Sequence, residues 1–166
     1  MVIVAALYRF ARLADPAALK PALETVARKG GVRGTLILAG EGINGTIAGP
    51  REGIDAVLDH VRAWPGFAEL DWKEATAENI PFGKLKVRIK DEIVTMGRPD
   101  VDPMERTGHY VEPSDWNDLI RAPDVAVIDT RNDYEVAIGS FDGAVDPETQ
   151  SFRDFPTWWQ ANRQRF

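Results

Sequence analysis

The stretch VRGTLILAGEGINGTIAG, from Val32 to Gly49, decides the fold. Its first part, Val32 to Leu38, is rich in Val, Thr, Ile and Leu, which predicts a strand. The glycine-rich residues 40–45 follow and contain Asn44-Gly45. Asn-Gly favours a hairpin bend, because both residues tolerate positive φ. We therefore expect a turn over residues 40–45 and another strand from Thr46.

A helix is predicted on each side of this hairpin. Before it, Asp15-Pro16 supplies an N-cap and a first-turn proline, and Gly30-Gly31 end the helix. Pro21 either kinks this helix or marks its true start. Its apolar face would consist of Leu19, Leu23, Val26 and Ala27. After the hairpin, apolar residues at helical spacing predict a second helix that ends near Trp64: Ile54, Val57, Leu58 and Val61.

Two further strands are predicted, one before the first helix and one after the second. Residues 2–10 are almost continuously apolar, which predicts a central strand buried on both faces. Residues 67–73 predict a fourth strand. The order of elements is then β-α-β-β-α-β, so the predicted fold class is α+β ferredoxin-like.

One further strand, over residues 84–90, alternates strictly between basic and apolar residues. Leu85, Val87 and Ile89 are expected to face the core. The opposite face would carry four cations: Lys84, Lys86, Arg88 and Lys90. Such a row could bind a polyanion such as RNA. Alternatively, it is a solvated face whose lysines protect a sheet edge from aggregation.

Charge and composition indicate two units. Residues 1–98 carry 14 Lys and Arg against 12 Asp and Glu, whereas residues 99–166 carry 6 against 14. This asymmetry suggests that the two halves have different partners. We expect a first domain over 1–98, a Pro- and Asp-rich linker over 99–112, and a second unit over 113–166.

The second unit has the beginning of an α/β pattern. Residues 113–120 predict a short amphipathic helix, and Val125–Ile128 predict a buried parallel strand. A short helical or turn segment over 133–138 and the start of a helix within 152–166 follow. One strand cannot support a parallel sheet, so we expect this unit to be incomplete.

Four polar residues are candidates for a site, and each has two interpretations. Asp129 and Arg131 follow the predicted strand and could line an anion-binding edge. Alternatively, Arg131 forms a structural ion pair with Asp129 or Glu135. Glu41 and Asn44 could face a ligand, or they could simply belong to the hairpin.

Several chemistries are excluded within these residues. There is no cysteine, which excludes disulfides, thiolate ligands and thiol nucleophiles. The only histidines are His60 and His109, so no metal site is expected. No glycine-rich nucleotide-binding motif occurs, and no apolar run is long enough to cross a membrane.

Four motifs together resemble a known family, the rhodanese-domain tRNA uridine hydroxylases, often labelled rhodanese-related sulfurtransferases. The motifs are Glu41–Thr46, Leu85–Gly97, Val127–Glu135 and Gly139–Ala144. The resemblance extends over essentially the whole chain. It implies an acylphosphatase-like domain over 1–98, followed in 113–166 by the first part of an α/β rhodanese domain.

The resemblance also implies a function. Members of the family are cytoplasmic bacterial enzymes that hydroxylate carbon 5 of the wobble uridine in tRNA, with molecular oxygen as co-substrate and no evident cofactor. It favours tRNA as the partner of Lys84, Lys86, Arg88 and Lys90. The catalytic cysteine is expected beyond Phe166, so this chain would be a truncated form without a catalytic residue. A sulfurtransferase and a non-catalytic RNA-binding module are the alternatives, and the oligomeric state stays open.

Overall fold

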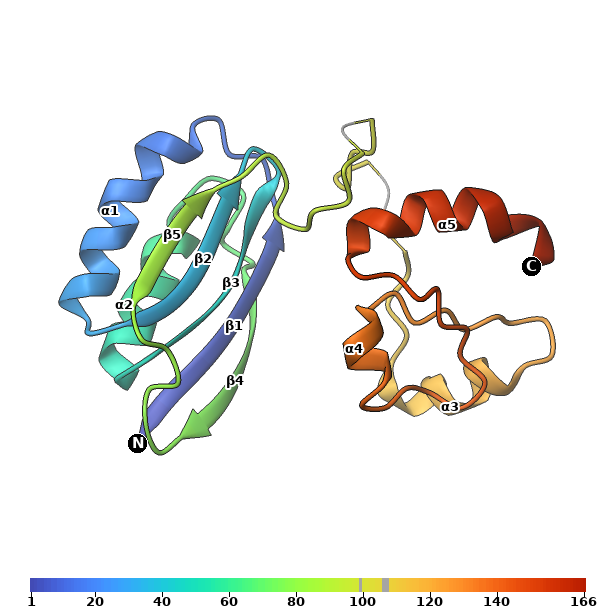
Figure 1. The fold of residues 1–166 in the computed structure, drawn as a ribbon. Coiled ribbons are helices and arrows are strands. Elements are labelled where there is room, and N and C mark those ends of the chain that lie inside the picture. Colours follow the sequence, from blue (N-terminus) through green and yellow to red (C-terminus); the bar gives the residue numbers. More distant parts are fainter. Residues whose placement is uncertain (99, 106–107) are drawn as a thin grey trace. The chain divides into compact units, whose positions relative to one another are not determined.

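The structure is a computed structural model that describes residues 1–98, 100–105 and 108–166. The chain forms two compact units (Figure 1). The first consists of Met1–Val94 with Asp102–Glu105, and the second of Thr95–Val101 with Arg106–Phe166.

The first unit contains a five-stranded mixed sheet and two helices. Along the chain the elements are β1 (Val2–Phe10), α1 (Pro16–Lys29), β2 (Arg33–Ala39), β3 (Gly42–Gly49), α2 (Arg51–Arg62), β4 (Asp71–Ala77) and β5 (Leu85–Ile89). The strand order in the sheet is β4-β1-β3-β2-β5. All neighbours are antiparallel except β2 and β5, which are parallel. The predicted order of elements, and with it the α+β ferredoxin-like fold of this unit, is confirmed.

Both helices lie on the same face of the sheet (Figure 1). The hydrophobic core fills the space between the helices and the sheet. Ile3, Ala5 and Leu7 of β1 point into this core, whereas Ala6 and Tyr8 of β1 are exposed. The prediction that β1 is buried on both faces was therefore wrong. Its apolar residues alternate between the core and a face that neither helix covers, which we call the open face.

The two helices begin and pack as the sequence predicts. The Asp15 carboxylate accepts a hydrogen bond from the Ala18 amide at 3.0 Å and so caps α1. Pro21 lies inside α1 and is not its start. The helices approach closely at two glycines, because a Cβ at Gly53 of α2 would lie only 2.1 Å from the carbonyl oxygen of Gly30.

The hairpin between β2 and β3 is tighter than predicted. Gly40 and Glu41 alone connect the strands, since Ala39 pairs with Gly42. Asn44-Gly45 lies inside β3, not at a bend. A Cβ at Gly45 would lie 2.1 Å from the carbonyl oxygen of Thr35, so this glycine permits close packing of β2 on β3.

The fourth strand is also displaced from its predicted position. It runs from Asp71 to Ala77, four residues later than the predicted start. Phe67 and Leu70, which the prediction placed in the strand, are buried in the turns that precede it. Apolar residues in a buried turn gave the same local pattern as a strand.

Helices are the regular elements in the described part of the second unit. It contains α3 (Pro113–Arg121), α4 (Asp133–Val136) and α5 (Phe155–Asn162), with 3₁₀ turns at Phe152–Asp154 and Arg163–Arg165. The predicted strand at Val125–Ile128 does not form, because Ile128 makes only an isolated parallel bridge with Val145. Of the described residues, those whose hydrophobic side chains are fully buried all belong to the first unit.

Candidate functional site

The four predicted cations lie along β5, at the edge of the sheet. Lys86 and Arg88 pair with Thr35 and Ile37 of β2, and their side chains are exposed on the open face. Lys84 and Lys90 flank the strand and are also exposed. They continue its alternation, because the Lys84 carbonyl accepts from the Gly34 amide at 3.1 Å and the Lys90 amide donates to the Leu38 carbonyl at 2.9 Å.

The opposite face of β5 is less buried than predicted. Val87 is buried and Leu85 is half-buried, but Ile89 is 44% exposed. An edge strand has a neighbour on one side only, and this leaves Ile89 uncovered. The prediction that all three side chains face the core was thus wrong for Ile89.

The electrostatic environment of the four cations is simple. Within the described residues, Lys84, Lys86, Arg88 and Lys90 form no ion pair, although seven other cations do. Their charges are therefore not neutralised by neighbouring carboxylates. This arrangement suits a surface that meets an external anion.

Glu41 and Asn44 bind the chain itself. The Ile93 amide donates a hydrogen bond to the Glu41 carboxylate at 2.6 Å. The Asn44 side-chain amide donates to the Ile93 carbonyl oxygen at 2.9 Å. Both groups thus hold the backbone of Ile93, whose side chain is buried. The motif Glu41–Thr46 is in this way joined to the motif Leu85–Gly97.

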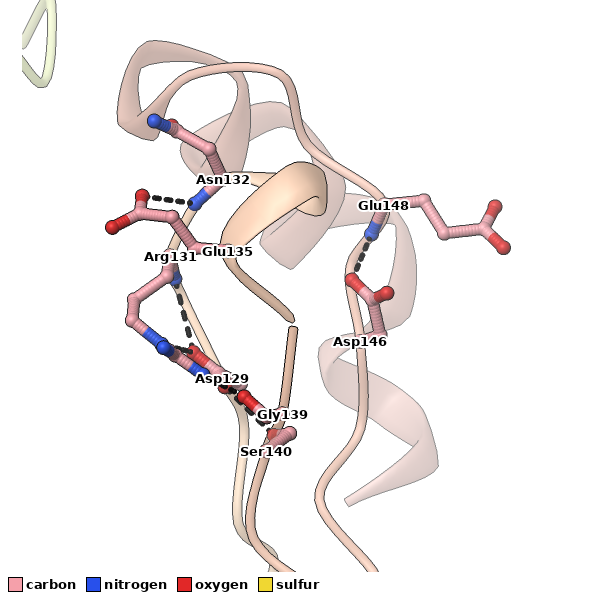
Figure 2. Close-up of polar contacts among 8 residues, drawn as sticks. All are labelled: Asp129, Arg131, Asn132, Glu135, Gly139, Ser140, Asp146 and Glu148. Carbon is pink, nitrogen blue, oxygen red and sulfur yellow. Dashed lines mark hydrogen bonds and ion pairs between the residues drawn. The ribbon is translucent and has the colours of Figure 1, made fainter. Parts of the chain in front are cut away.

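Asp129 and Arg131 form an ion pair in the second unit (Figure 2). Arg131 Nη2 lies 2.7 Å from Asp129 Oδ2, and Arg131 Nε lies 3.0 Å from Asp129 Oδ1. Ser140 Oγ also donates to Asp129 Oδ2, at 2.7 Å. The bonds from Arg131 and then Ser140 hold the pKa of Asp129 well below its usual range.

This ion pair links two further motifs. Arg131 Nη2 donates to the Gly139 carbonyl oxygen at 2.6 Å, so the Val127–Glu135 and Gly139–Ala144 motifs meet at Asp129 and Arg131. Glu135 instead accepts from the Asn132 amide at 3.3 Å, as part of the cap of α4. The structural pair of Arg131 is therefore with Asp129. Sequence reasoning did not single out Ser140 as its partner, although Ser140 belongs to one of the motifs.

Two other general features bear on function. Within the part of the chain that the structure describes, no group of three or more acidic or histidine side chains is arranged to hold a metal ion. In the same residues, none of the helices has the length and apolar character needed to cross a membrane.

Comparison with known proteins identifies the family. Residues 2–93 match the family model of the UPF0176 acylphosphatase-like domain, which is more than half of the chain. The chain belongs to this family. The matched residues coincide with the sheet and helices of the first unit. The rhodanese assignment of residues 113–166 stays a prediction.

Curated relatives extend over the whole chain. A protein of Roseobacter denitrificans is 65% identical and one of Ruegeria pomeroyi is 70% identical, each over all 166 residues. Both are named tRNA uridine(34) hydroxylase. The chain spans about half the length of these relatives, 56% and 55% respectively.

One solved structure similar to part of this chain is an acylphosphatase from Coxiella burnetii. The comparison has a TM-score of 0.37 at 12% sequence identity. It covers 54% of this chain and 90% of the acylphosphatase.

Proposed function

We propose that these residues belong to an enzyme that hydroxylates carbon 5 of the wobble uridine in tRNA, with molecular oxygen as co-substrate, in the bacterial cytoplasm. The observation that carries the proposal is the identity of 65–70% over the whole chain to relatives named tRNA uridine(34) hydroxylase. The UPF0176 family match over the first unit is consistent with it.

Different parts of the protein bind the tRNA and carry the catalytic group. The ferredoxin-like domain over 1–98 holds the tRNA, and residues 99–112 link it to the beginning of a rhodanese domain over 113–166. The catalytic group lies outside these residues, because the expected nucleophile is a cysteine and the sequence has none. Support for tRNA binding comes from the four exposed cations of β5: Lys84, Lys86, Arg88 and Lys90.

The other candidate residues then act as positioning residues. Glu41 and Asn44 fix the backbone of Ile93, just after the basic strand ends. Asp129 and Arg131 hold Gly139 and Ser140 in place in the second unit. In this proposal none of the four contacts the reacting atoms.

Nucleoside analysis tests the proposal. The gene that encodes these residues is deleted from its bacterium, and tRNA nucleosides from the deletion strain and from the restored strain are compared by mass spectrometry. We expect 5-oxygenated uridine to disappear and to return with the gene, while thiolated uridines stay constant. Loss of thiolated uridine alone would instead indicate a sulfurtransferase. An unchanged nucleoside profile would contradict any role in tRNA modification.

A further inference from the structure

The open face of the first unit carries an ordered row of side chains across all five strands. Strand pairing aligns one residue from each strand, from one edge of the sheet to the other: Lys86, Thr35, Thr46, Ala6 and Lys73. Strands lie about 4.8 Å apart, so about 19 Å separates the backbones of the two lysines. The row therefore has a cation at each end and small or hydroxyl side chains between.

The neighbouring row places an aromatic ring on an interior strand. It consists of Arg88, Ile37, Asn44, Tyr8 and Asp71. The chain covers this row at Asn44, which binds the carbonyl oxygen of the buried residue Ile93, so the path across the sheet runs along the first row. Tyr8 is 37% exposed, and its ring packs edge-on against Phe10 at 5.1 Å between centroids. The T-shaped contact with Phe10 fixes the Tyr8 ring on β1, with Lys73 on the adjoining strand β4.

The charge of the open face is strongly positive. Among the strand residues that point to this face there are four cations and one carboxylate, Asp71. The cations are Arg33, Lys73, Lys86 and Arg88, all of them exposed. None of the four forms an ion pair within the described residues. The face is thus complementary to an extended anion.

The combination of a flat ring with flanking cations favours unpaired RNA over other anions. Bases of single-stranded RNA stack on exposed aromatic rings, while lysine and arginine neutralise the backbone phosphates. A base-paired stem presents its phosphates, 2′-hydroxyls and base edges to such a surface but no free base face, because its bases are already stacked on one another. A stem would therefore use the cations and leave Tyr8 without a role.

We propose that the open face binds unpaired nucleotides of tRNA. The nucleotides cross the strands between Lys73 of β4 and Lys86 of β5, and one base stacks on Tyr8. This inference rests on the proposed function, which supplies tRNA as the substrate. It goes further by naming the surface, the direction of the strand across the sheet and the stacking residue.

Binding experiments on the 166-residue chain test this inference. The probe is a labelled stem–loop RNA with a uridine in its unpaired loop, and a fully paired RNA of equal length serves for comparison. The variants are Tyr8→Leu, Tyr8→Phe and the double substitution Lys86→Gln with Arg88→Gln. The matched control, Arg28→Gln with Lys29→Gln, removes the same charge from exposed residues of α1 on the helix-covered side. Thermal melts confirm that each variant folds.

We expect Tyr8→Leu to weaken stem–loop binding by roughly 5- to 150-fold, whereas Tyr8→Phe keeps the ring and binds within about twofold of the parent chain. The Lys86 and Arg88 double variant should weaken binding and lower the slope of log K against log salt by about 1.4. The α1 control should bind like the parent chain. The paired RNA should not respond to Tyr8→Leu.

Three results would overturn the inference: no binding of the stem–loop by the parent chain, no effect of a folded Tyr8→Leu variant, or an equal loss in the α1 control. Failure of the proposed function is distinguishable from these. In that case the chain could bind the stem–loop through Tyr8 as described, yet deletion of the gene would leave position 34 of tRNA unchanged.

Discussion

The carboxylate of Glu41 and the backbone amide of Ile93 are joined by a 2.6 Å hydrogen bond across 52 positions of sequence. Asn44 completes the contact by donating to the carbonyl oxygen of the same residue. The chain is thereby fixed where it leaves β5, at the end of the basic strand. The tight β2–β3 hairpin acts as an anchor for a segment far from it in sequence.

Removing the Glu41 carboxylate should lower the stability of the first unit. Glu41→Ala leaves the Ile93 amide without its acceptor, and we expect a loss of about 1–3 kcal/mol in the free energy of unfolding. Glu41→Gln keeps an oxygen acceptor and should cost less. Urea unfolding measures both. Glu78→Ala, at an exposed carboxylate of the same unit, is the control and should change stability by less than about 0.5 kcal/mol. Equal losses at Glu41 and Glu78 would show that the Ile93 contact is not stabilising.

The close approach of the two helices predicts a cost for a single methyl group. Gly53→Ala would place a Cβ 2.1 Å from the backbone oxygen of Gly30. Alanine has the better helix propensity, by about 1 kcal/mol, but the rigid backbone oxygen must move. We expect a net loss of about 1–3 kcal/mol by urea unfolding. Gly83→Ala, whose Cβ would have no atom within 4 Å, should be close to neutral. A stabilised Gly53→Ala variant would mean that the helices separate without cost.

A carboxylate of β4 gives a prediction about pH. Hydrogen bonds from Arg51 and then Trp72 lower the pKa of Glu74 from 4.5 to about 2. Because the pKa is depressed in the folded state, this pair stabilises the fold above pH 4.5, and the contribution is lost as pH falls toward 2. NMR titration of the Glu74 carboxyl should give the low value. Arg51→Gln should raise the pKa of Glu74 toward 4.5.

The control is Lys20→Gln, which alters an ion pair with Glu24 of α1 and should leave the pKa of Glu74 unchanged. A Glu74 pKa near 4.5 in the parent chain would contradict the contact with Arg51.

The Asp129 carboxylate should protect the backbone amides of the surrounding residues from hydrogen exchange. Asp129→Asn removes the charge that Arg131 and Ser140 contact, so we expect faster amide exchange over residues 129–145, measured as protection factors at pH 7. The pKa of Asp129 is depressed, so the difference from the parent chain should persist down to about pH 4 and shrink only in stronger acid. Asp142→Asn, at an exposed carboxylate of the adjacent turn, should not change the exchange rates. Equal rates in the Asp129→Asn and parent chains would show that the ion pair does not order this loop.

Local sequence patterns predicted the first unit well where the pattern reflects one helix or one strand. The α1 and α2 helices follow their apolar spacing, and Asp15 caps α1 as expected. The prediction that β1 is buried on both faces was wrong because Val4 and Ala6 are apolar although they point away from the core. Only the placement of both helices on one side of the sheet distinguishes these residues from Ile3 and Ala5.

Contacts between distant segments were beyond sequence reasoning. Asn44-Gly45 has the composition of a bend, but the approach of Thr35 and the hydrogen bond to Ile93 place it inside β3. Val125–Ile128 has the composition of a buried strand, yet a strand forms only where neighbours pair with it. Tyr8 likewise became a candidate only after strand pairing placed it on the open face, in the row of Arg88 and next to the row of Lys73 and Lys86.

The most direct test of the central claim is an NMR titration of the ¹⁵N-labelled 166-residue chain with the stem–loop RNA. We predict that the largest changes in backbone amide shifts occur in β1, β2 and β5, around Tyr8, Thr35 and Lys86, and that α1 and α2 change little. Shifts that are concentrated on the two helices, or the absence of any shift on addition of RNA, would contradict it.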